Sequence, residues 1–292
     1  MTGGNRILGT SSHMSGDYYA PYFEMGVPYL HWGGMHATRR LLERCALASK
    51  QRVLDVGCGS GYSVCWMAKR YGCEVVGLDI SPRVVNQAVR CAGVWAPGLD
   101  VAFCVADAHT LPFQDGVFDA VITEFVTQFL DVPRALQEYV RVVKCGGVVG
   151  MNELSIADST PADIRRTITD ALQTFQHVSG LVLHLYTPSQ WREWCHSAGL
   201  RDIHMERIAG TYLWRDYAKA LGGWYPLIRL RFRMMRRVFI DAKFRHQAVQ
   251  TARLAYFLFR SRKFRSHVHA LLIVGKKQST RITEKTSREG GV

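Results

Sequence analysis

Three glycines and an acid lie in a pattern that could bind an adenosine-containing ligand. The apolar run that starts at Val53 ends in the turn Gly57-Cys-Gly-Ser-Gly61, and a second apolar run ends at Asp79, with Ile80 after it. Glycine permits a sharp turn and a close backbone approach to a ligand, and the amides that open the following helix are hydrogen-bond donors. Asp79 can accept both hydroxyls of a ribose.

Two ligand classes use such a turn, the dinucleotides and S-adenosylmethionine. Tyr62 stands three residues after Gly59, where the dinucleotide pattern requires glycine, and Asp55 precedes the turn. A carboxylate at that place would repel a pyrophosphate but attract an ammonium group, directly or through water. The turn therefore favours S-adenosylmethionine as the cofactor, with S-adenosylhomocysteine as the product.

Further motifs extend the pattern from about residue 38 to residue 152. They are Ala106-Asp-Ala108, Leu111-Pro-Phe113, Gly116-Val-Phe-Asp119 and Arg141-Val-Val-Lys-Cys-Gly-Gly147. With them the chain resembles the class I S-adenosylmethionine-dependent methyltransferases, and among these the branch of the ubiquinone, menaquinone, sterol and tocopherol methyltransferases. The resemblance implies that Asp107 and Ala108 lie against the adenine. The predicted cofactor-binding residues are Asp55, Gly57, Gly59, Gly61, Asp79, Ile80, Asp107, Ala108 and Glu124.

The alternation of strand-like and helix-like segments predicts an α/β, Rossmann-like, doubly wound sheet. Its expected strands are 52–56, 74–79, 100–105, 118–123, 147–153, 201–208 and 270–275, and its expected helices are 35–48, 61–71, 82–92, 133–143 and 188–198. The family resemblance implies that the last of these seven strands is antiparallel and that a mainly helical cap is added. Asp119 lies where a strand enters the sheet, away from the ligand edge, so we interpret it as structural.

The expected division of the chain follows from the same segments. It comprises an N-terminal leader and cap segment (1–34), the cofactor-binding core (35–154), a cap insertion (155–186), a continuation of the core (187–209), a basic helical cap insertion (210–269), the final core strand (270–277) and a tail (278–292). With 292 residues, of which 48% are hydrophobic, the chain can bury one elaborated α/β domain.

Aromatic residues before the first core helix could enclose an apolar or planar acceptor, although the same rings could merely pack the leader onto the domain. Because ligands bind beyond the carboxyl ends of parallel strands, polar residues near that edge are the candidates for catalysis. The predicted catalytic residues are Glu124, His31 and Tyr22, although each histidine could equally be structural or exposed. The predicted substrate-binding residues are Tyr18, Tyr22, Gln128, His184 and Tyr186.

Positive charge is concentrated in one segment. Fourteen of the 37 Lys and Arg residues lie between Arg229 and Lys277, where Asp241 is the one acid, and the rest of the chain has 23 basic and 23 acidic residues. Helical spacing places Arg229, Arg233, Arg236 and Arg237 on one face, with Arg231 as an exception, and Leu227, Leu230, Met234, Met235, Val238 and Phe239 on the other. Such a segment could be a solvated face, contact an anionic membrane through 229–265 or an amphiphilic substrate, or bind nucleic acid.

Other features narrow the class of protein. No apolar run reaches the 18 or more residues of a membrane span, and no secretory signal is visible, so the expected location is the cytoplasm, including its membrane surface. The eight cysteines show no Cys-x-x-Cys spacing, no metal site is predicted, and cysteine-dependent arsenic methylation is the less favoured alternative.

The predicted function is methyl transfer by in-line displacement to a small, largely apolar or aromatic metabolite, such as a lipid-like molecule or a natural-product intermediate. The alternative is an RNA or protein methyltransferase that docks its substrate through 229–277. A scaffold that binds the cofactor without catalysis is a third reading. The acceptor atom, the need for a general base and the oligomeric state stay open.

Overall fold

The computed structural model describes residues 17–208, 214–261 and 263–278. The predicted leader up to residue 16 and the predicted tail beyond residue 278 lie outside the described residues, as does the start of the basic insertion.

Seven strands form one sheet in the order β3-β2-β1-β4-β5-β7-β6. Strands β1 to β5 pair in parallel, and β7 runs antiparallel to both β5 and β6. This confirms the predicted doubly wound sheet and its antiparallel last strand. The strands are β1 (Arg52–Val56), β2 (Glu74–Asp79), β3 (Val101–Val105), β4 (Phe118–Glu124), β5 (Val143–Ile156), β6 (Leu200–Ile208) and β7 (Val268–Lys277).

Helices cover both faces of the sheet. Val53 packs with α3 (Gly34–Cys45), α4 (Tyr62–Tyr71) and α5 (Pro82–Trp95), whereas its neighbour Leu54 packs with the helices of the other face. Because successive side chains of a strand point to opposite faces, a strand covered on both faces is apolar throughout, which is why these strands read as continuous apolar runs. The helices of the other face are α6 (Val132–Val142) and α8 (Pro188–Ser197).

Strand β5 is longer than the predicted strand 147–153. It begins at Val143, which pairs with Phe118 of β4. It extends to Ile156 because β7 pairs with it over nine successive residues, from Val148↔Lys276 to Ile156↔Val268. The partner lies more than one hundred residues away in the sequence, so no local pattern could set this boundary.

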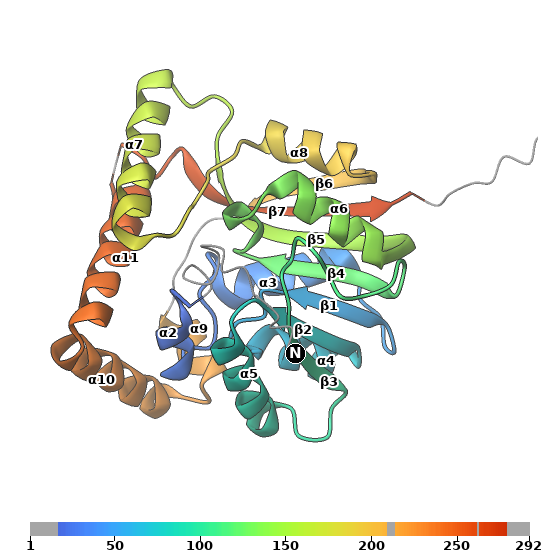
Figure 1. Cartoon of the computed structure of the whole chain (residues 1–292), viewed down its shortest axis with the longest axis horizontal. Helices are drawn as coiled ribbons and strands as arrows, with labels where there is room; N and C mark the ends of the chain where they lie inside the picture. Colours follow the sequence, from blue (N-terminus) through green and yellow to red (C-terminus); the bar gives the residue numbers. More distant parts are fainter. Residues whose placement is uncertain (1–16, 209–213, 262, 279–292) are drawn as a thin grey trace, which may run out of the picture.

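The cap helices lie beyond the carboxyl ends of the parallel strands. In Figure 1 these strands point to the left, toward α2, and α7, α11 and α10 form an outer column there. None of the helices in the described part of the chain is long and apolar enough to span a bilayer. The cap helices are α2 (Ala20–Glu24), α7 (Ala162–Ser179), α9 (Trp214–Ala220), α10 (Trp224–Ile240) and α11 (Ala242–Arg260).

Helix α10 buries only part of the apolar face predicted for the basic segment. Leu227 and Leu230 are buried as predicted, but Met235 and Phe239, assigned to the same apolar face, are exposed to solvent. The apolar arc of the helix is wider than the surface that the cap can cover, because only one side of it contacts α2 and α11. An exposed apolar strip therefore remains.

Candidate active site

A cavity of about 260 Å³ opens at the carboxyl ends of β1, β2 and β4, where the order of the strands reverses. Open α/β sheets bind their ligands at this place. Because the strands lie in the order β3-β2-β1-β4, the carboxylates at or just after their carboxyl ends succeed one another along the cavity edge. These are Asp107, Asp79, Asp55 and Glu124, and all four line the cavity.

The glycine-rich turn brings the backbone close to the cavity. Gly57 has a φ of +74°, and a β-carbon there would lie 2.2 Å from Cγ2 of Val126. Its amide and that of Cys58 donate to the carbonyl of Leu78, at 2.7 and 2.9 Å, so the turn is fixed to the end of β2. Gly61, in the left-handed region, precedes α4 and caps it. Only glycine fits the first of these positions without displacing a neighbour.

Two carboxylates beside this turn carry the charge of the site. Asp55 is 3% exposed, and its Oδ2 has no hydrogen-bond partner among the described residues. Burial raises the pKa of Asp55 well above its usual range, and the nearby Glu124 and Asp79 raise it further. Asp79 accepts from the amides of Gly59 and Ser81, at 3.2 and 3.0 Å, but burial still raises its pKa to about 6.

These neighbouring acids favour a positively charged ligand in the cavity. A buried carboxylate oxygen without a donor costs free energy until a ligand supplies one. A molecule that carries an ammonium group, a sulfonium and ribose hydroxyls would satisfy Asp55 and Asp79 together. The residues present therefore fit S-adenosylmethionine.

Glu124 accepts hydrogen bonds from three separate segments. Thr38 donates to both carboxylate oxygens at 3.0 Å, Ser63 to Oε1 at 3.3 Å and Asn152 to Oε2 at 3.2 Å. Nδ1 of His31 lies 3.5 Å from Oε2, and both of these side chains are 5% exposed. A carboxylate offers about four acceptor sites, so this one is nearly saturated. Such a group can orient the side chains that contact it.

Asp107 forms a local turn with a histidine that sequence reasoning missed. Its Oδ1 accepts from the amide of His109 at 2.9 Å and lies 2.8 Å from the Nδ1 of that ring. The amide of Asp131 donates to Nε2 of His109, so the proton of the neutral ring lies on Nδ1 and is donated to Asp107. An Asp followed two residues later by a histidine was the available signal. Ala108 beside it is buried.

Helix α2 lies over the glycine-rich turn. The ring of Phe23 lies so close to Gly59 that a β-carbon there would be 2.8 Å from it, and the hydroxyl of Ser60 donates to the carbonyl of Pro28. Arg83 of α5 binds Glu24 at 2.7 Å. We call the segment of residues 17–31 the lid.

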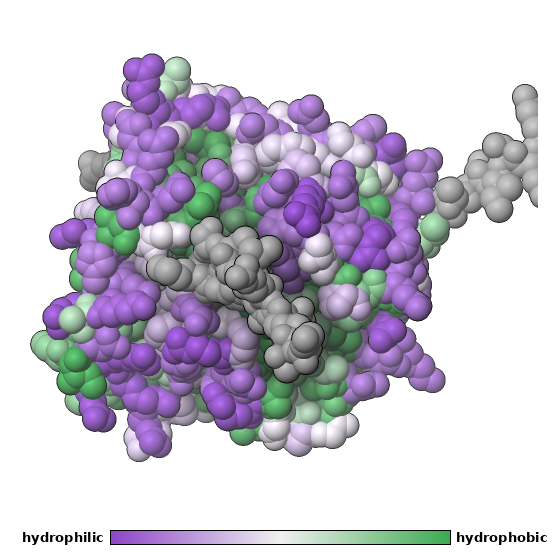
Figure 2. Space-filling view, in the orientation of Figure 1, coloured by the Kyte–Doolittle hydropathy of each residue, from purple (hydrophilic) through white to green (hydrophobic). Residues whose placement is uncertain are grey.

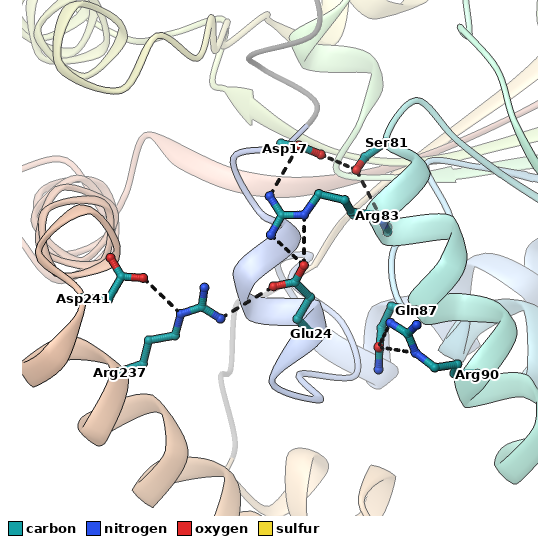
Figure 3. A network of polar contacts seen from close by, with 9 residues as sticks. Asp17, Glu24, Ser81, Arg83, Gln87, Arg90, Arg237 and Asp241 are labelled. Atoms are coloured by element: carbon teal, nitrogen blue, oxygen red, sulfur yellow. Dashed lines mark hydrogen bonds and ion pairs between the residues drawn. The ribbon is translucent and has the colours of Figure 1, made fainter.

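Ion pairs connect the lid to the core on one side and to the cap on the other (Figure 3). Arg83 also reaches Asp17, at 3.5 Å, whose carboxylate accepts from the hydroxyl of Ser81. On the cap side, Arg237 lies 3.6 Å from Glu24 and 3.4 Å from Asp241. Glu24 is thus shared between the core helix α5 and the cap helix α10.

Five residues predicted to bind or act on a substrate lie outside the lining of this cavity, and their roles stay predictions. Tyr18 donates its hydroxyl to the carbonyl of Gln247 in α11, and the ring of Tyr22 packs on Phe244 at 5.1 Å, so both join the leader to the cap. Gln128 is fully buried, where it accepts from the amide of Leu154. The remaining two are His184 and Tyr186, whose rings stack on each other.

The apolar part of the cavity combines residues that the sequence did not single out with Tyr19 and Leu30 of the leader, where aromatic residues were expected to enclose an acceptor. Phe125 and Phe129 follow β4, and Leu181 and Val182 follow α7. The buried carboxylate of Glu153 fixes the first pair, because it accepts the amides of Val126 to Gln128. Phe125 has a φ of +63°, a strained conformation for a large side chain. Tyr19, Leu30 and Leu130 complete this part.

Two cysteines lie near the cofactor turn, Cys58 within it and Cys65 in α4. Cys58 and Cys65 are buried, and burial raises the pKa of both thiols, which keeps them protonated. Within the described ranges, no group of three His, Cys, Asp or Glu side chains is placed to hold a metal ion.

Comparison with known proteins agrees with these features. A family profile described as a methyltransferase domain matches residues 54–151. The chain is 37% identical over 131 residues to the demethylmenaquinone methyltransferase of Thermus thermophilus, covering 44% of this chain and 59% of that protein. It is 30% identical over 139 residues to phosphoethanolamine N-methyltransferase 1 of Triticum aestivum, covering 47% of this chain and 28% of that protein. The chain thus spans less than two thirds of these relatives.

A solved structure matches over nearly the whole chain. It is the crystal structure of the cyclase SpnF, with a TM-score of 0.71 and 21% identity, covering 95% of this chain and all of that one. At this identity the match shows the fold alone. Together with the profile, the strand order and the acids of the cavity edge, it leads to one conclusion. The chain contains a class I S-adenosylmethionine-dependent methyltransferase domain, as its motifs predict.

Proposed function

We propose that the protein transfers a methyl group from S-adenosylmethionine to a small, largely apolar or aromatic acceptor. The observation that carries this proposal is the composition of the cavity, in which a row of carboxylates is continued by apolar side chains after β4 and α7. An acceptor among Phe125, Phe129 and Leu181 would be shielded from water beside the cofactor.

Each acid of the cavity edge has a proposed role. Asp55 would hold the ammonium group of the cofactor, and Asp79 the ribose hydroxyls. Asp107 and Ala108 would contact the adenine, and the turn at Gly57 would let the backbone approach the ligand. When bound, the cofactor supplies an electrophilic methyl group, whose bond to sulfur breaks with the electron pair left on sulfur while a lone pair of the acceptor forms the new bond.

We propose His31 as the group that takes up the acceptor's proton, with Glu124 as its positioning residue. Nδ1 of His31 faces Glu124, and its Nε2 lies 3.3 Å from the hydroxyl of Thr38. Both ring nitrogens of His31 thus face oxygen atoms, and Glu124 is itself fixed in place by several donors. The sequence made Glu124 the first candidate for catalysis, whereas this proposal assigns the proton transfer to His31.

Replacement of His31 tests this assignment. His31→Gln is expected to lower kcat about 100-fold or more with a phenol or amine acceptor, because a positioned base contributes that much, and to leave the affinity for S-adenosylmethionine unchanged. His36→Gln is the matched control, since His36 is exposed on α3. A kcat within twofold of the unaltered protein in His31→Gln would refute the role of His31.

The affinity for S-adenosylmethionine is expected to fall about tenfold between pH 7.5 and pH 5. Ribose hydroxyls donate to ionised Asp79, whose pKa is about 6 before binding, so about nine tenths of this carboxyl is protonated at pH 5. Calorimetric titration across this pH range measures the effect, and Asp79→Asn should flatten the profile around pH 6. A constant affinity in the unaltered protein would contradict this role of Asp79.

The reaction itself needs an assay separate from cofactor binding, because a cyclase shares this fold. The purified chain is incubated with methyl-labelled S-adenosylmethionine and, in parallel, with hydroquinones, catechols, aliphatic amines, bulk RNA and an unrelated protein. Label in a small organic product supports the proposal. Label that enters RNA or protein instead would favour docking through 229–277, and bound cofactor without transfer to any of these acceptors would refute methyl transfer to this class.

A further inference from the structure

Helix α10 presents a strip of large apolar side chains to solvent. Its inner side is packed on the lid and α11, where Leu230 is buried with Tyr22 and Phe244, and Leu227 is buried as well. On the opposite side, Tyr225, Phe232 and Phe239 are 70%, 67% and 74% exposed. At 3.6 residues per turn the outward side chains fall within an arc of about 100°. We call this strip the α10 ridge, and it consists of Trp224, Tyr225, Ile228, Phe232, Met235 and Phe239.

Arginines flank the α10 ridge on both sides. By helical position, Arg229 and Arg236 lie beside one edge and Arg231 beside the other, and all three are exposed. The guanidinium of Arg229 also lies over the ring of Tyr225, 5.8 Å from its centroid. No acidic residue occurs between Trp224 and Ile240. The exposed surface of α10 thus combines an apolar centre with a purely cationic margin.

Exposing this apolar surface to water costs free energy, and the arginines beside it indicate an anionic partner. Contiguous exposed apolar surface on a soluble protein marks a contact site, and single exposed residues would not. An anionic bilayer offers both complements, since its headgroups attract the arginines and its acyl boundary accepts the rings. In Figure 2 hydrophobic atoms lie among hydrophilic ones at the lower left, over α10. Nucleic acid would satisfy the arginines but would leave the apolar ridge in water.

We propose that the α10 ridge docks the protein on an anionic membrane surface, with the helix lying in the plane of the interface. The ridge faces away from the lid, so docking leaves the lid and the cavity on the protein side. This inference rests on the surface of α10 and is independent of the proposed methyl transfer.

Co-sedimentation of the full chain with vesicles tests the docking. We expect binding to phosphatidylcholine vesicles that contain about one third phosphatidylglycerol to be at least tenfold stronger than to phosphatidylcholine alone, and to weaken as salt is raised. The fluorescence of Trp224 should shift to shorter wavelength on binding. Equal binding to both vesicle types, or none to either in 0.1 M salt, would overturn the proposal.

Substitutions test the apolar part and the cationic part of the membrane contact separately. Phe232→Ser is expected to weaken binding to the anionic vesicles about tenfold, because a buried ring is lost, and Arg229→Gln with Arg231→Gln should reduce the dependence on salt. Val94→Ser is the matched control, since Val94 is 77% exposed but lies on α5. If Phe232→Ser leaves vesicle binding unchanged, or instead converts a dimer to a monomer in sedimentation velocity, the ridge does not dock on membranes.

Discussion

Replacing Gly57 with alanine is expected to lower the affinity for S-adenosylmethionine about 100-fold. A β-carbon at this position would lie 2.2 Å from Cγ2 of Val126, far inside van der Waals contact, so the turn must move by more than 1 Å. Misplacement of this size in a binding site costs about two orders of magnitude. Because the turn is fixed to Leu78 and adjoins Asp55, the displacement reaches the groups proposed to hold the cofactor.

Gly98→Ala is the matched control for this experiment. Gly98 has a φ of +73°, nearly that of Gly57, but no atom lies within 4 Å of a β-carbon there. Both variants carry the backbone strain of a left-handed alanine, about 1 kcal/mol, and only one carries the clash. Circular dichroism verifies that both fold, and calorimetry measures binding. A folded Gly57→Ala protein that binds as tightly as Gly98→Ala would exclude this turn as the cofactor site.

Asp55→Asn is expected to have effects of opposite sign on stability and on binding. Burial first, and then Glu124 and Asp79, raise the pKa of Asp55, so the folded protein disfavours its ionised form. When folding raises the pKa of an acid, the folded protein loses stability as the pH rises above the acid's ordinary pKa. Near pH 8 this loss of stability is present. An asparagine side chain does not ionise, so this loss of stability is absent from the variant. The melting temperature of the ligand-free variant should therefore rise.

The same substitution removes the carboxylate proposed for the ammonium group. Loss of one partner from a buried ion pair costs roughly 2–5 kcal/mol, so affinity for S-adenosylmethionine should fall about 100-fold. Asp119→Asn is the control. Partial burial acts to raise the pKa of Asp119, but hydrogen bonds from Lys144 and the amide of Arg52 lower it overall, so its loss should destabilise the protein and leave binding unchanged. A less stable Asp55→Asn protein with full affinity would contradict both expectations.

The sequence predicted the cofactor half of the cavity better than the acceptor half, for a physical reason. Asp55, Asp79 and Asp107 each lie at or just after the carboxyl end of their own strand, and the parallel sheet brings strand ends to one edge whatever the rest of the chain does. A local pattern of an apolar run, glycines and an acid therefore contains nearly all the information that places them. Their roles toward a ligand stay predictions.

The acceptor half has no such local origin. Phe125 and Leu181 line one cavity although they are separated by more than fifty residues. They come together because the chain after α7 runs back to the end of β4. The same limit explains Tyr18 and Tyr22, which the aromatic composition of the leader assigned to the substrate. Their rings face α7 and α11 instead, while their neighbours Tyr19 and Phe23 face the cavity.

The shared position of Glu24 has a consequence for turnover. Phe23 and Pro28 cover the glycine-rich turn, so we expect a spent cofactor to leave when residues 17–31 lift away from α5 and α10. Lifting separates Glu24 from Arg83 and Arg237 together, and these partly exposed pairs weaken as ions screen them over about 10 Å at 0.1 M salt. We therefore expect S-adenosylhomocysteine to be exchanged for S-adenosylmethionine faster at higher ionic strength, because Arg83 and Arg237 then hold Glu24 less tightly.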